Sequence, residues 1–350
     1  MQYRPLGRTG MTVSPYALGA MMFGAVGNSD HDECIRMVHL ALDHGINFVD
    51  TADMYSTGES EEIVGKALQG RRDDVILASK GHFAVGDEGP NRSGNSRRHL
   101  TRALEASLDR LGTDYLDLYQ VHRPDFATDI EETLGVLTDL VRAGKIRAFG
   151  LSTYPAHEIV EAHRVADARG LMRPRTEQPP YNLLARGIER DVLPVAQQWG
   201  MGVLTWSPLA FGFLTGRHRK GSDPVTSGRA GLRPAWFDPT DPVVARKLDA
   251  VERLVGVAED LGCTLPELAV AFPLAHPGVT SVIIGPRTMP QLEASLAGAS
   301  LELGDDVMDR IDAIVPPGAD VYEPNAAFDV PWLTRPGLRR RPSGARAAAA

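Results

Sequence analysis

Four residues of this chain could together deliver a proton to a carbonyl oxygen: Asp50, Tyr55, Lys80 and His122. An unperturbed tyrosine titrates near ~10, which is too high for ready proton donation at neutral pH. A nearby ammonium favours the phenolate and lowers this pKa, and Lys80 can supply that charge while Asp50 holds it in place. His122 can donate a hydrogen bond to the carbonyl oxygen. Because this set contains no nucleophile and no metal cage, the reaction needs electrons from a cofactor.

These residues lie where strand-like segments end. The three segments read NFVDTADMY, VILASKGHF and LDLYQVHRPD, and each opens with an apolar run. Polar groups at the carboxyl ends of successive parallel strands meet at one mouth of a β/α barrel, where barrel enzymes have their active sites. Any one of these residues alone could be a helix cap or a surface charge. Their combination at strand ends indicates catalysis.

Strand-like and helix-like segments alternate along the chain. The predicted strands are Tyr16–Ala20, Ile46–Asp50, Val75–Lys80, Tyr115–Val121, Ile146–Leu151, Arg175–Gln178, Gly202–Trp206 and Ser281–Ile284. The predicted helices are Asp32–His44, Glu59–Gln69, Arg97–Leu111, Ile130–Ala143, Ala156–Ala168, Ile188–Trp199, Val244–Leu261 and Met289–Leu296. This alternation predicts an α/β fold, a single (β/α)₈ TIM barrel that spans residues 1–330.

Some segments depart from the simple repeat. Residues 1–15 predict a short hairpin with RTG as its turn, at the bottom of the barrel. Residues 207–243 form a long Gly/Pro-rich loop after the seventh strand, and we expect it to act as a cofactor or substrate lid. Residues 264–275 and 304–315 predict extra helices, and residues 331–350 predict a flexible basic tail.

Composition narrows the class of protein. The 350 residues are 43% hydrophobic and 23% charged, which is typical of a soluble globular protein. Cys34 and Cys263 match no zinc or CxxC spacing. The net charge of −8 argues against a nucleic-acid partner. No secretory h-region and no apolar run of membrane length are visible, so we expect no membrane association and a cytoplasmic protein. The oligomeric state stays open.

Longer motifs make the chain resemble the aldo-keto reductase family. They are YRPLGRTGMTVSPYALGAMMFG, GINFVDTADMYSTGESEEIVGKAL, SLDRLGTDYLDLYQVHRPD, GKIRAFGLSTY, TWSPLAFGFLTG and SVIIGPRTMPQLEASL, and together they span about five-sixths of the chain. The catalytic tetrad of the family falls on the four residues named above. The resemblance implies reduction of an aldehyde or ketone with NADPH, or alternatively NADH. The HRPD form and the long loop resemble the bacterial and channel-subunit branch.

The resemblance also implies how the cofactor is held, in the absence of a Rossmann GxGxxG after a strand. Ser152 and Gln178 would hold the carboxamide, and Trp206 would stack on the nicotinamide. The residues implied for the pyrophosphate and phosphates are Ser207, Leu209, Gly212, Arg217 and Arg229. The residues implied for the adenosine end are Gly285, Arg287 and Gln291. Arg287 would meet the 2′-phosphate of NADPH, because a guanidinium suits phosphate geometry.

Departures from the family pattern concern the cofactor and the substrate. Thr153 stands where the family often has Asn. Ala294 and Ser295 replace a Glu-Asn pair that often grips adenine. The substrate pocket is expected to be apolar and suited to an aromatic or medium-sized carbonyl compound. Its expected walls are Met22, Phe23, Phe83 and Tyr154, beside Tyr55.

Two other functions are alternatives to a reductase: a nucleotide-binding sensor, and a barrel isomerase or metal hydrolase. A channel β-subunit-like protein would use the fold as a nucleotide-binding sensor with little turnover. In that group an Asn matches His122, so His122 favours the enzyme. A barrel isomerase or metal hydrolase would need a phosphate grip or carboxylate–His ligands, and the sequence contains neither constellation.

Overall fold

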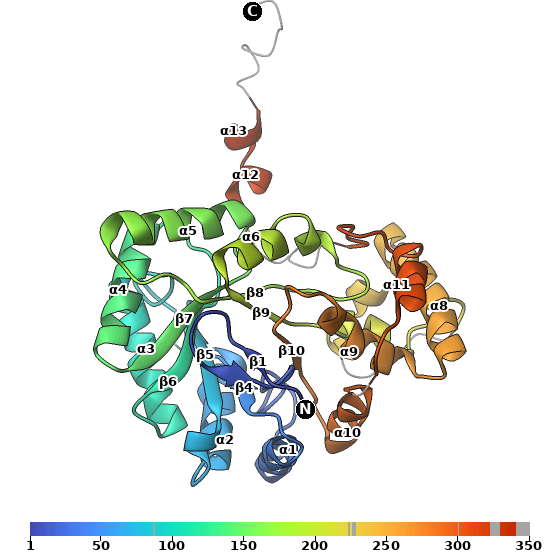
Figure 1. Cartoon of the computed structure of the whole chain (residues 1–350), viewed down its shortest axis with the longest axis horizontal. Helices are drawn as coiled ribbons and strands as arrows, with labels where there is room; N and C mark the ends of the chain where they lie inside the picture. Colours follow the sequence, from blue (N-terminus) through green and yellow to red (C-terminus); the bar gives the residue numbers. More distant parts are fainter. Residues whose placement is uncertain (87, 223–224, 226–228, 300, 323–329, 341–350) are drawn as a thin grey trace, which may run out of the picture.

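Eight parallel strands close into a barrel in a computed structural model that describes residues 1–86, 88–222, 225, 229–299, 301–322 and 330–340 (Figure 1). The strands are β3 (Tyr16–Gly19), β4 (Phe48–Asp50), β5 (Ile76–Gly81), β6 (Leu116–Val121), β7 (Ile146–Ser152), β8 (Thr176–Gln178), β9 (Gly202–Thr205) and β10 (Ser281–Ile284). Neighbours in the ring follow chain order, and β10 closes the ring by pairing with β3, with Val282 opposite Tyr16. The predicted (β/α)₈ barrel is therefore confirmed.

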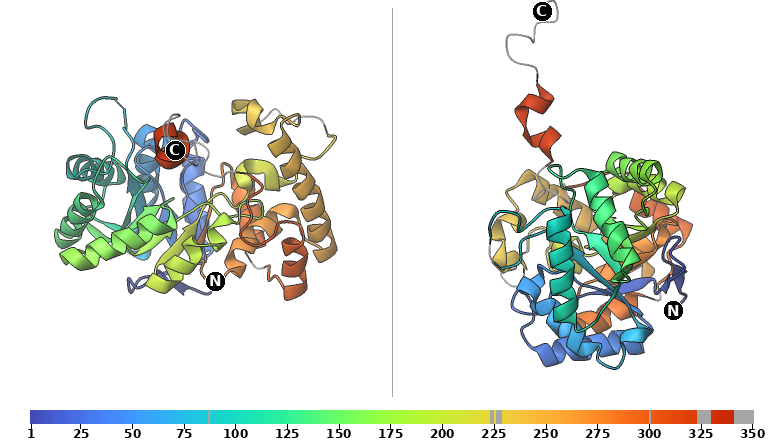
Figure 2. Two further views of the ribbon diagram at one scale, coloured as in Figure 1. Left: turned by 90° about the horizontal axis from the view of Figure 1, so that it is seen from above. Right: turned by 90° about the vertical axis from the view of Figure 1, so that its left-hand side faces the viewer.

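Helices surround the strands on the outside of the barrel (Figures 1 and 2). The main ones are α1 (His31–Asp43), α2 (Glu59–Ala67), α3 (Arg97–Leu111), α4 (Ile130–Arg142), α5 (Ala156–Arg169), α6 (Val192–Trp199), α8 (Pro242–Leu261) and α10 (Met289–Gly298). Helix α6 begins later than predicted, because Asp191 caps it and the preceding residues form the 3₁₀ helix η3 (Gly187–Glu189). Gly200 ends α6 in a left-handed conformation, which glycine adopts without a steric penalty.

The core has two layers, because side chains alternate between the two faces of each strand. Leu118 points into the barrel and Tyr119 points outward to the helices. The short hairpin of β1 (Arg4–Pro5) and β2 (Thr12–Val13) confirms the predicted N-terminal hairpin. It lies at the amino ends of the strands, where Leu6 joins the inner cluster and Gly7 approaches Gly202. The barrel bottom is therefore closed, and its carboxyl-end mouth is left for chemistry.

The segments outside the repeat are more structured than the sequence indicated. The long loop after β9 contains η4 (Ala210–Thr215), α7 (Arg229–Leu232) and η5 (Pro234–Phe237). The extra helices are present as α9 (Leu265–Ala275) and α11 (Asp305–Asp312). In the predicted tail, α12 (Pro331–Thr334) and α13 (Pro336–Arg339) stand away from the barrel (Figures 1 and 2). Residues 341–350 of that tail lie outside the described residues.

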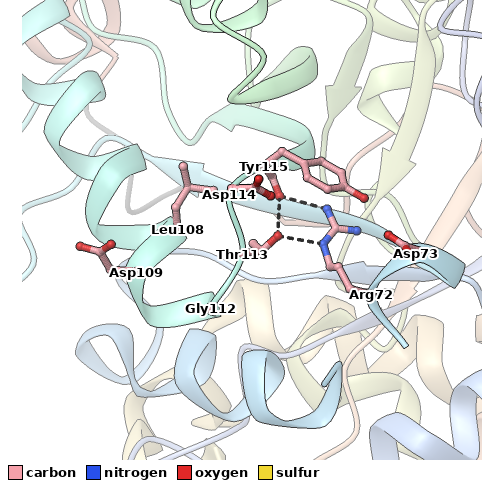
Figure 3. A pocket seen from close by; sticks show the side chains of 8 residues that line it. All are labelled: Arg72, Asp73, Leu108, Asp109, Gly112, Thr113, Asp114 and Tyr115. Carbon is pink, nitrogen blue, oxygen red and sulfur yellow. Dashed lines mark hydrogen bonds between the residues drawn. The ribbon is translucent and has the colours of Figure 1, made fainter. Parts of the chain in front are cut away.

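A surface pocket of about 530 Å³ lies at the amino ends of β5 and β6, away from the mouth. Its lining residues are Arg72, Asp73, Leu108, Asp109, Gly112, Thr113, Asp114 and Tyr115 (Figure 3). The Arg72 guanidinium donates to the carbonyl oxygens of Val75 and Tyr115 and pairs with Asp117 at 2.9 Å. The charge and the donors of Arg72 are already engaged, so this side chain links the starts of β5 and β6.

Candidate active site

The four predicted catalytic residues come together at the carboxyl ends of β4, β5 and β6. Asp50 ends β4, Lys80 lies near the end of β5, and Tyr55 opens the 3₁₀ helix η1 (Tyr55–Gly58). The Lys80 Nζ donates to Asp50 Oδ1 at 2.5 Å and to Tyr55 Oη at 3.2 Å. It also donates to the carbonyl oxygen of Thr51 at 2.8 Å. All three protons of the ammonium therefore have an acceptor.

Lys80 and Asp50 form a buried ion pair. Lys80 is 0% exposed and Asp50 is 2% exposed. Burial opposes the charge of Lys80, but Asp50 and Tyr55 together hold its pKa above the ordinary value. The second oxygen of Asp50 accepts hydrogen bonds from Gln178 Nε2 at 2.9 Å and Gln120 Nε2 at 3.3 Å. A buried pair is tolerable when its remaining lone pairs are satisfied in this way.

The sequence reasoning missed Gln120, although a signal was present. It is a polar residue inside an otherwise apolar strand, and it lies two positions before His122 on the same face. Strand alternation places both side chains toward the barrel mouth.

His122 follows β6 and directs a neutral ring toward the site. Its ring stands edge-on to Tyr55, with centroids 5.8 Å apart, and to Phe83, with centroids 5.1 Å apart. Burial, followed by the charges of Lys80 and Arg123, holds the pKa of His122 well below its ordinary value. The imidazole is therefore uncharged at neutral pH and can donate a hydrogen bond without bringing a third cation to the site.

Three residues expected around the nicotinamide meet at one backbone oxygen. The Ser152 hydroxyl donates to the carbonyl oxygen of Gln178 at 3.0 Å, and Trp206 Nε1 donates to the same oxygen at 3.2 Å. The side chain of Gln178 in turn donates to Asp50. The residues expected to hold the ring are thus linked by hydrogen bonds to the catalytic set.

The residues expected to bind the pyrophosphate follow β9 in a stretch of irregular backbone. Ser207 has a φ of +61° and Phe211 a φ of +58°, both left-handed. All seven non-glycine residues with positive φ in the described chain lie in loops that follow a barrel strand. Such backbone strain concentrates at functional sites. The backbone at the mouth of the barrel is therefore strained at several residues, whereas the strands that form its walls are regular.

The remaining phosphate-side residues are spread along the same loop. Leu209 packs partly against the core, Gly212 has a φ of +111°, and Arg217 is exposed. Arg229 is the first residue of α7, and its side chain lies outside the described part of the chain. A Cβ on Gly212 would meet only His218 Nε2, 4.0 Å away, so this glycine borders open space.

The adenosine-side residues follow β10. The Arg287 amide donates to Gln291 Oε1 at 2.9 Å, and a Cβ on Gly285 would meet nothing within 4 Å. Ala294 is exposed, and the Ser295 hydroxyl donates back to the Gln291 carbonyl oxygen. Asn28, which the sequence did not single out, donates to the Arg287 carbonyl oxygen at 2.8 Å. No local signal in the sequence distinguishes Asn28 from other loop residues.

The expected substrate walls divide into two groups. Met22 and Phe83 are partly exposed, and Phe83 lies against His122. Phe23 and Tyr154 lie instead in the main hydrophobic core, at 0% and 4% exposure. The Tyr154 hydroxyl accepts a hydrogen bond from Asn95. These two side chains therefore pack into the core from the loops that follow β3 and β7 and do not line the mouth.

The residues present fit a nicotinamide dinucleotide. Ser152, Gln178 and Trp206 lie beside the candidate catalytic set, and Gly212 and Gly285 each border open space in the loops after β9 and β10. When bound, such a cofactor supplies the hydride that this donor set lacks. Within the described residues, no cluster of His, Cys, Asp and Glu could hold a metal ion. A search of the same residues finds no helix with the length and apolarity that a bilayer crossing requires.

Comparison with known proteins shows the family to which the chain belongs. The aldo/keto reductase family pattern matches residues 16–316. The chain is 37% identical over 322 residues to a probable voltage-gated potassium channel subunit beta of Arabidopsis thaliana, covering 90% of this chain and 97% of the relative. It is 37% identical over 334 residues to the uncharacterized oxidoreductase YrpG of Bacillus subtilis (strain 168), covering 92% and 99%. The chain therefore belongs to the aldo/keto reductase family and is an NAD(P)H-dependent oxidoreductase.

Proposed function

We propose that this protein reduces an aldehyde or ketone to an alcohol with NADPH, and that Tyr55 donates the proton. The observation that carries the proposal is the Lys80 ammonium, which is bonded to both Asp50 and Tyr55 at the mouth of the barrel. The neutral ring of His122 stands edge-on to Tyr55. The reaction is reversible, so the same groups also serve alcohol oxidation.

Each residue of the set has one task in this proposal. A nicotinamide cofactor, when bound, would supply the hydride that the carbonyl carbon receives. Tyr55 gives its proton to the carbonyl oxygen, and Lys80 stabilises the phenolate that results. Asp50 keeps Lys80 charged and in position. His122 donates a hydrogen bond that orients the carbonyl group, and Trp206 stacks on the nicotinamide.

A sensor with little turnover is the second candidate, because relatives carry the name of a potassium channel subunit beta. A sensor needs the cofactor site but has no use for a complete proton-donating set. Steady oxidation of NADPH in the presence of simple aldehydes separates the two functions, because a sensor would bind NADPH without sustained turnover.

The direct test is Tyr55→Phe, assayed for aldehyde reduction and for NADPH affinity. General acid catalysis is worth about 10²–10⁴-fold, so we expect a loss of turnover of that size. Cofactor affinity should stay near the wild-type value, since the ring is kept. Tyr115→Phe is the matched control, because Tyr115 lies at the opposite end of the barrel. Retention of most turnover by Tyr55→Phe would disprove the assignment.

The preference for NADPH over NADH rests on Arg287 beside the Gly285 gap. A charge-assisted hydrogen bond from an arginine to the 2′-phosphate is worth about 1.5–3 kcal/mol, which is about 10- to 150-fold in affinity. Arg287→Ala should lose this margin for NADPH and leave NADH affinity unchanged. Arg310→Ala, which removes only a surface ion pair with Asp260, is the control. Equal affinities for the two cofactors in the wild type would exclude the preference.

A further inference from the structure

Arg123 follows His122 directly and places a second cation at the mouth of the barrel. Its Nη1 donates to the His122 carbonyl oxygen at 2.7 Å. Its charge acts on Tyr55, on His122 and on Glu177. The guanidinium therefore lies beside the residues that would contact a substrate carbonyl group.

This cation has no dedicated counter-ion. Within the described residues Arg123 forms no ion pair, and its only hydrogen bond is the one to the His122 carbonyl oxygen. Burial lowers its pKa, and Tyr55 and Glu177 oppose that shift. Arg186, by contrast, is buried and pairs with Glu189 at 2.8 Å and Asp312 at 2.6 Å. Arg123 is partly exposed, so an anion from outside the chain can still reach a cation that no described carboxylate pairs with.

The two nearby carboxyl groups do not neutralise Arg123. Glu177 is fully buried, burial raises its pKa to about 8, and it forms no ion pair with Arg123 among the described residues. Its Oε1 already accepts a hydrogen bond from the Tyr154 amide. Asp125 accepts from the amides of Asn95 and Ala127 and from the Thr128 hydroxyl. The guanidinium is left available to an anion that comes from outside the chain.

The position of Arg123 points to the substrate rather than to the cofactor phosphates. In the ring of strands β6 lies opposite β10, with three strands between them on either side. The residues proposed for the phosphates and the adenosine follow β9 and β10, whereas Arg123 follows β6. The Arg123 guanidinium bonds the carbonyl oxygen of His122, whose neutral ring stands against Phe83. Lys80, the other cation on this side of the mouth, is engaged by Asp50, Thr51 and Tyr55, so Arg123 is the one left without an ion pair among the described residues.

We propose that Arg123 binds a carboxylate of the substrate, and that the preferred substrates are aldehydes or ketones that also carry an acidic group. This rests on the proposed reductase function and narrows its substrate class. A planar guanidinium can bond both oxygens of a carboxylate at once, which also fixes the direction of the substrate. The expected apolar pocket thus gains one charged anchor.

The test compares two aldehydes that differ mainly in charge, 4-carboxybenzaldehyde and methyl 4-formylbenzoate. Arg123→Met should lower kcat/KM for the acid by about 10- to 150-fold, the range of a hydrogen bond to a charged group, and mainly through KM. The ester should change by less than about threefold, because it makes no charged contact. Arg123→Lys should restore part of the loss for the acid. Arg98→Met, at an exposed position of α3, is the control.

Other outcomes overturn the inference in distinguishable ways. An equal loss for both aldehydes would mean that Arg123 only positions His122 through its carbonyl oxygen. A matching loss of NADPH affinity would assign Arg123 to the cofactor. If wild type with bound NADPH reduces neither aldehyde, the proposed function fails, and calorimetric titration with 4-(hydroxymethyl)benzoate then decides the inference alone. Binding that Arg123→Met abolishes would support it, and absence of binding to wild type would overturn it.

Discussion

Two buried aspartates only three positions apart behave in opposite ways. Asp50 is 2% exposed and Asp53 is 1% exposed. Asp50 faces the barrel interior, where Lys80, Gln178 and Gln120 donate to its two oxygens. Asp53 receives no hydrogen bond from any described side chain. Burial, followed by repulsion from Glu61, raises the pKa of Asp53 to about 8.

Asp50 and Asp53 differ because the nearby cations pair with Asp50 and with Glu61, and not with Asp53. On the outer side of the strands, Arg110 pairs with Glu61 at 2.7 Å, and the Ser79 hydroxyl donates to the other Glu61 oxygen. Arg110 therefore forms its ion pair with Glu61 and not with Asp53. Burial alone therefore does not decide how a carboxyl group is paired in this barrel. Asp50 has a dedicated cation in Lys80, whereas Asp53 lacks one and its pKa is raised to about 8.

The substitution Lys80→Met should have the largest effect, because it removes the cation of Asp50 and leaves this buried carboxyl group unpaired, as Asp53 is. Removing one partner of a buried pair costs about 3–5 kcal/mol of unfolding free energy. Chemical denaturation should show a loss of this size, and the double variant Lys80→Met/Asp50→Leu should recover part of it. Lys145→Met, which breaks a surface pair with Glu105, should cost less than about 1 kcal/mol. Similar losses in the two single variants would contradict the contrast.

A smaller effect is expected from Asp53→Asn, and it depends on pH. The folded pKa of Asp53 is about 8, whereas an unfolded aspartate titrates near ~3.9. The folded state therefore holds the extra proton, and stability from this group is complete below pH ~4 and is lost as pH rises toward ~8. Asparagine cannot ionise, so the variant should lose less stability between pH 5 and pH 8. The difference is at most about 1.4 kcal/mol per pH unit.

Unfolding of wild type and Asp53→Asn across this pH range measures the slope directly. Glu62→Gln is the control, because Glu62 lies in the first turn of α2 and is exposed. Identical slopes in wild type and Asp53→Asn would mean that Asp53 is charged in the folded protein at neutral pH.

The smallest effect should come from Gln120→Leu. Its bond to Asp50 is long, at 3.3 Å, and the same oxygen keeps the shorter bond from Gln178 at 2.9 Å. Loss of one such bond costs about 0.5–1.5 kcal/mol. Unfolding free energy should fall by that amount, and turnover should fall by less than about tenfold. A larger effect than that of Gln178→Leu would reverse the order of the two amides around Asp50.

The parts that the sequence could predict are those that depend on alternation along the chain. Apolar strands followed by polar residues identify Asp50, Lys80 and His122, and the alternation with helices identifies the barrel. Other features depend on which side chains meet after closure. The burial of Phe23 follows from the turn of its loop, and the state of Asp53 follows from competition for Arg110. Neither can be inferred from local spacing.

The pairing of β10 with β3 has a consequence for synthesis of the chain. Val282 and Ile284 of β10 pair with Tyr16 and Leu18 of β3. The first barrel strand therefore cannot complete its pairing until the last strand has been synthesised. About 270 residues separate Tyr16 from Ile284, and translation at ~5–20 residues per second spreads them over roughly 15–55 s. During that time β3 presents an open edge, and open strand edges recruit other chains. The growing chain on the ribosome is therefore more open to such pairing than the finished barrel, whose closed ring has no free strand edge.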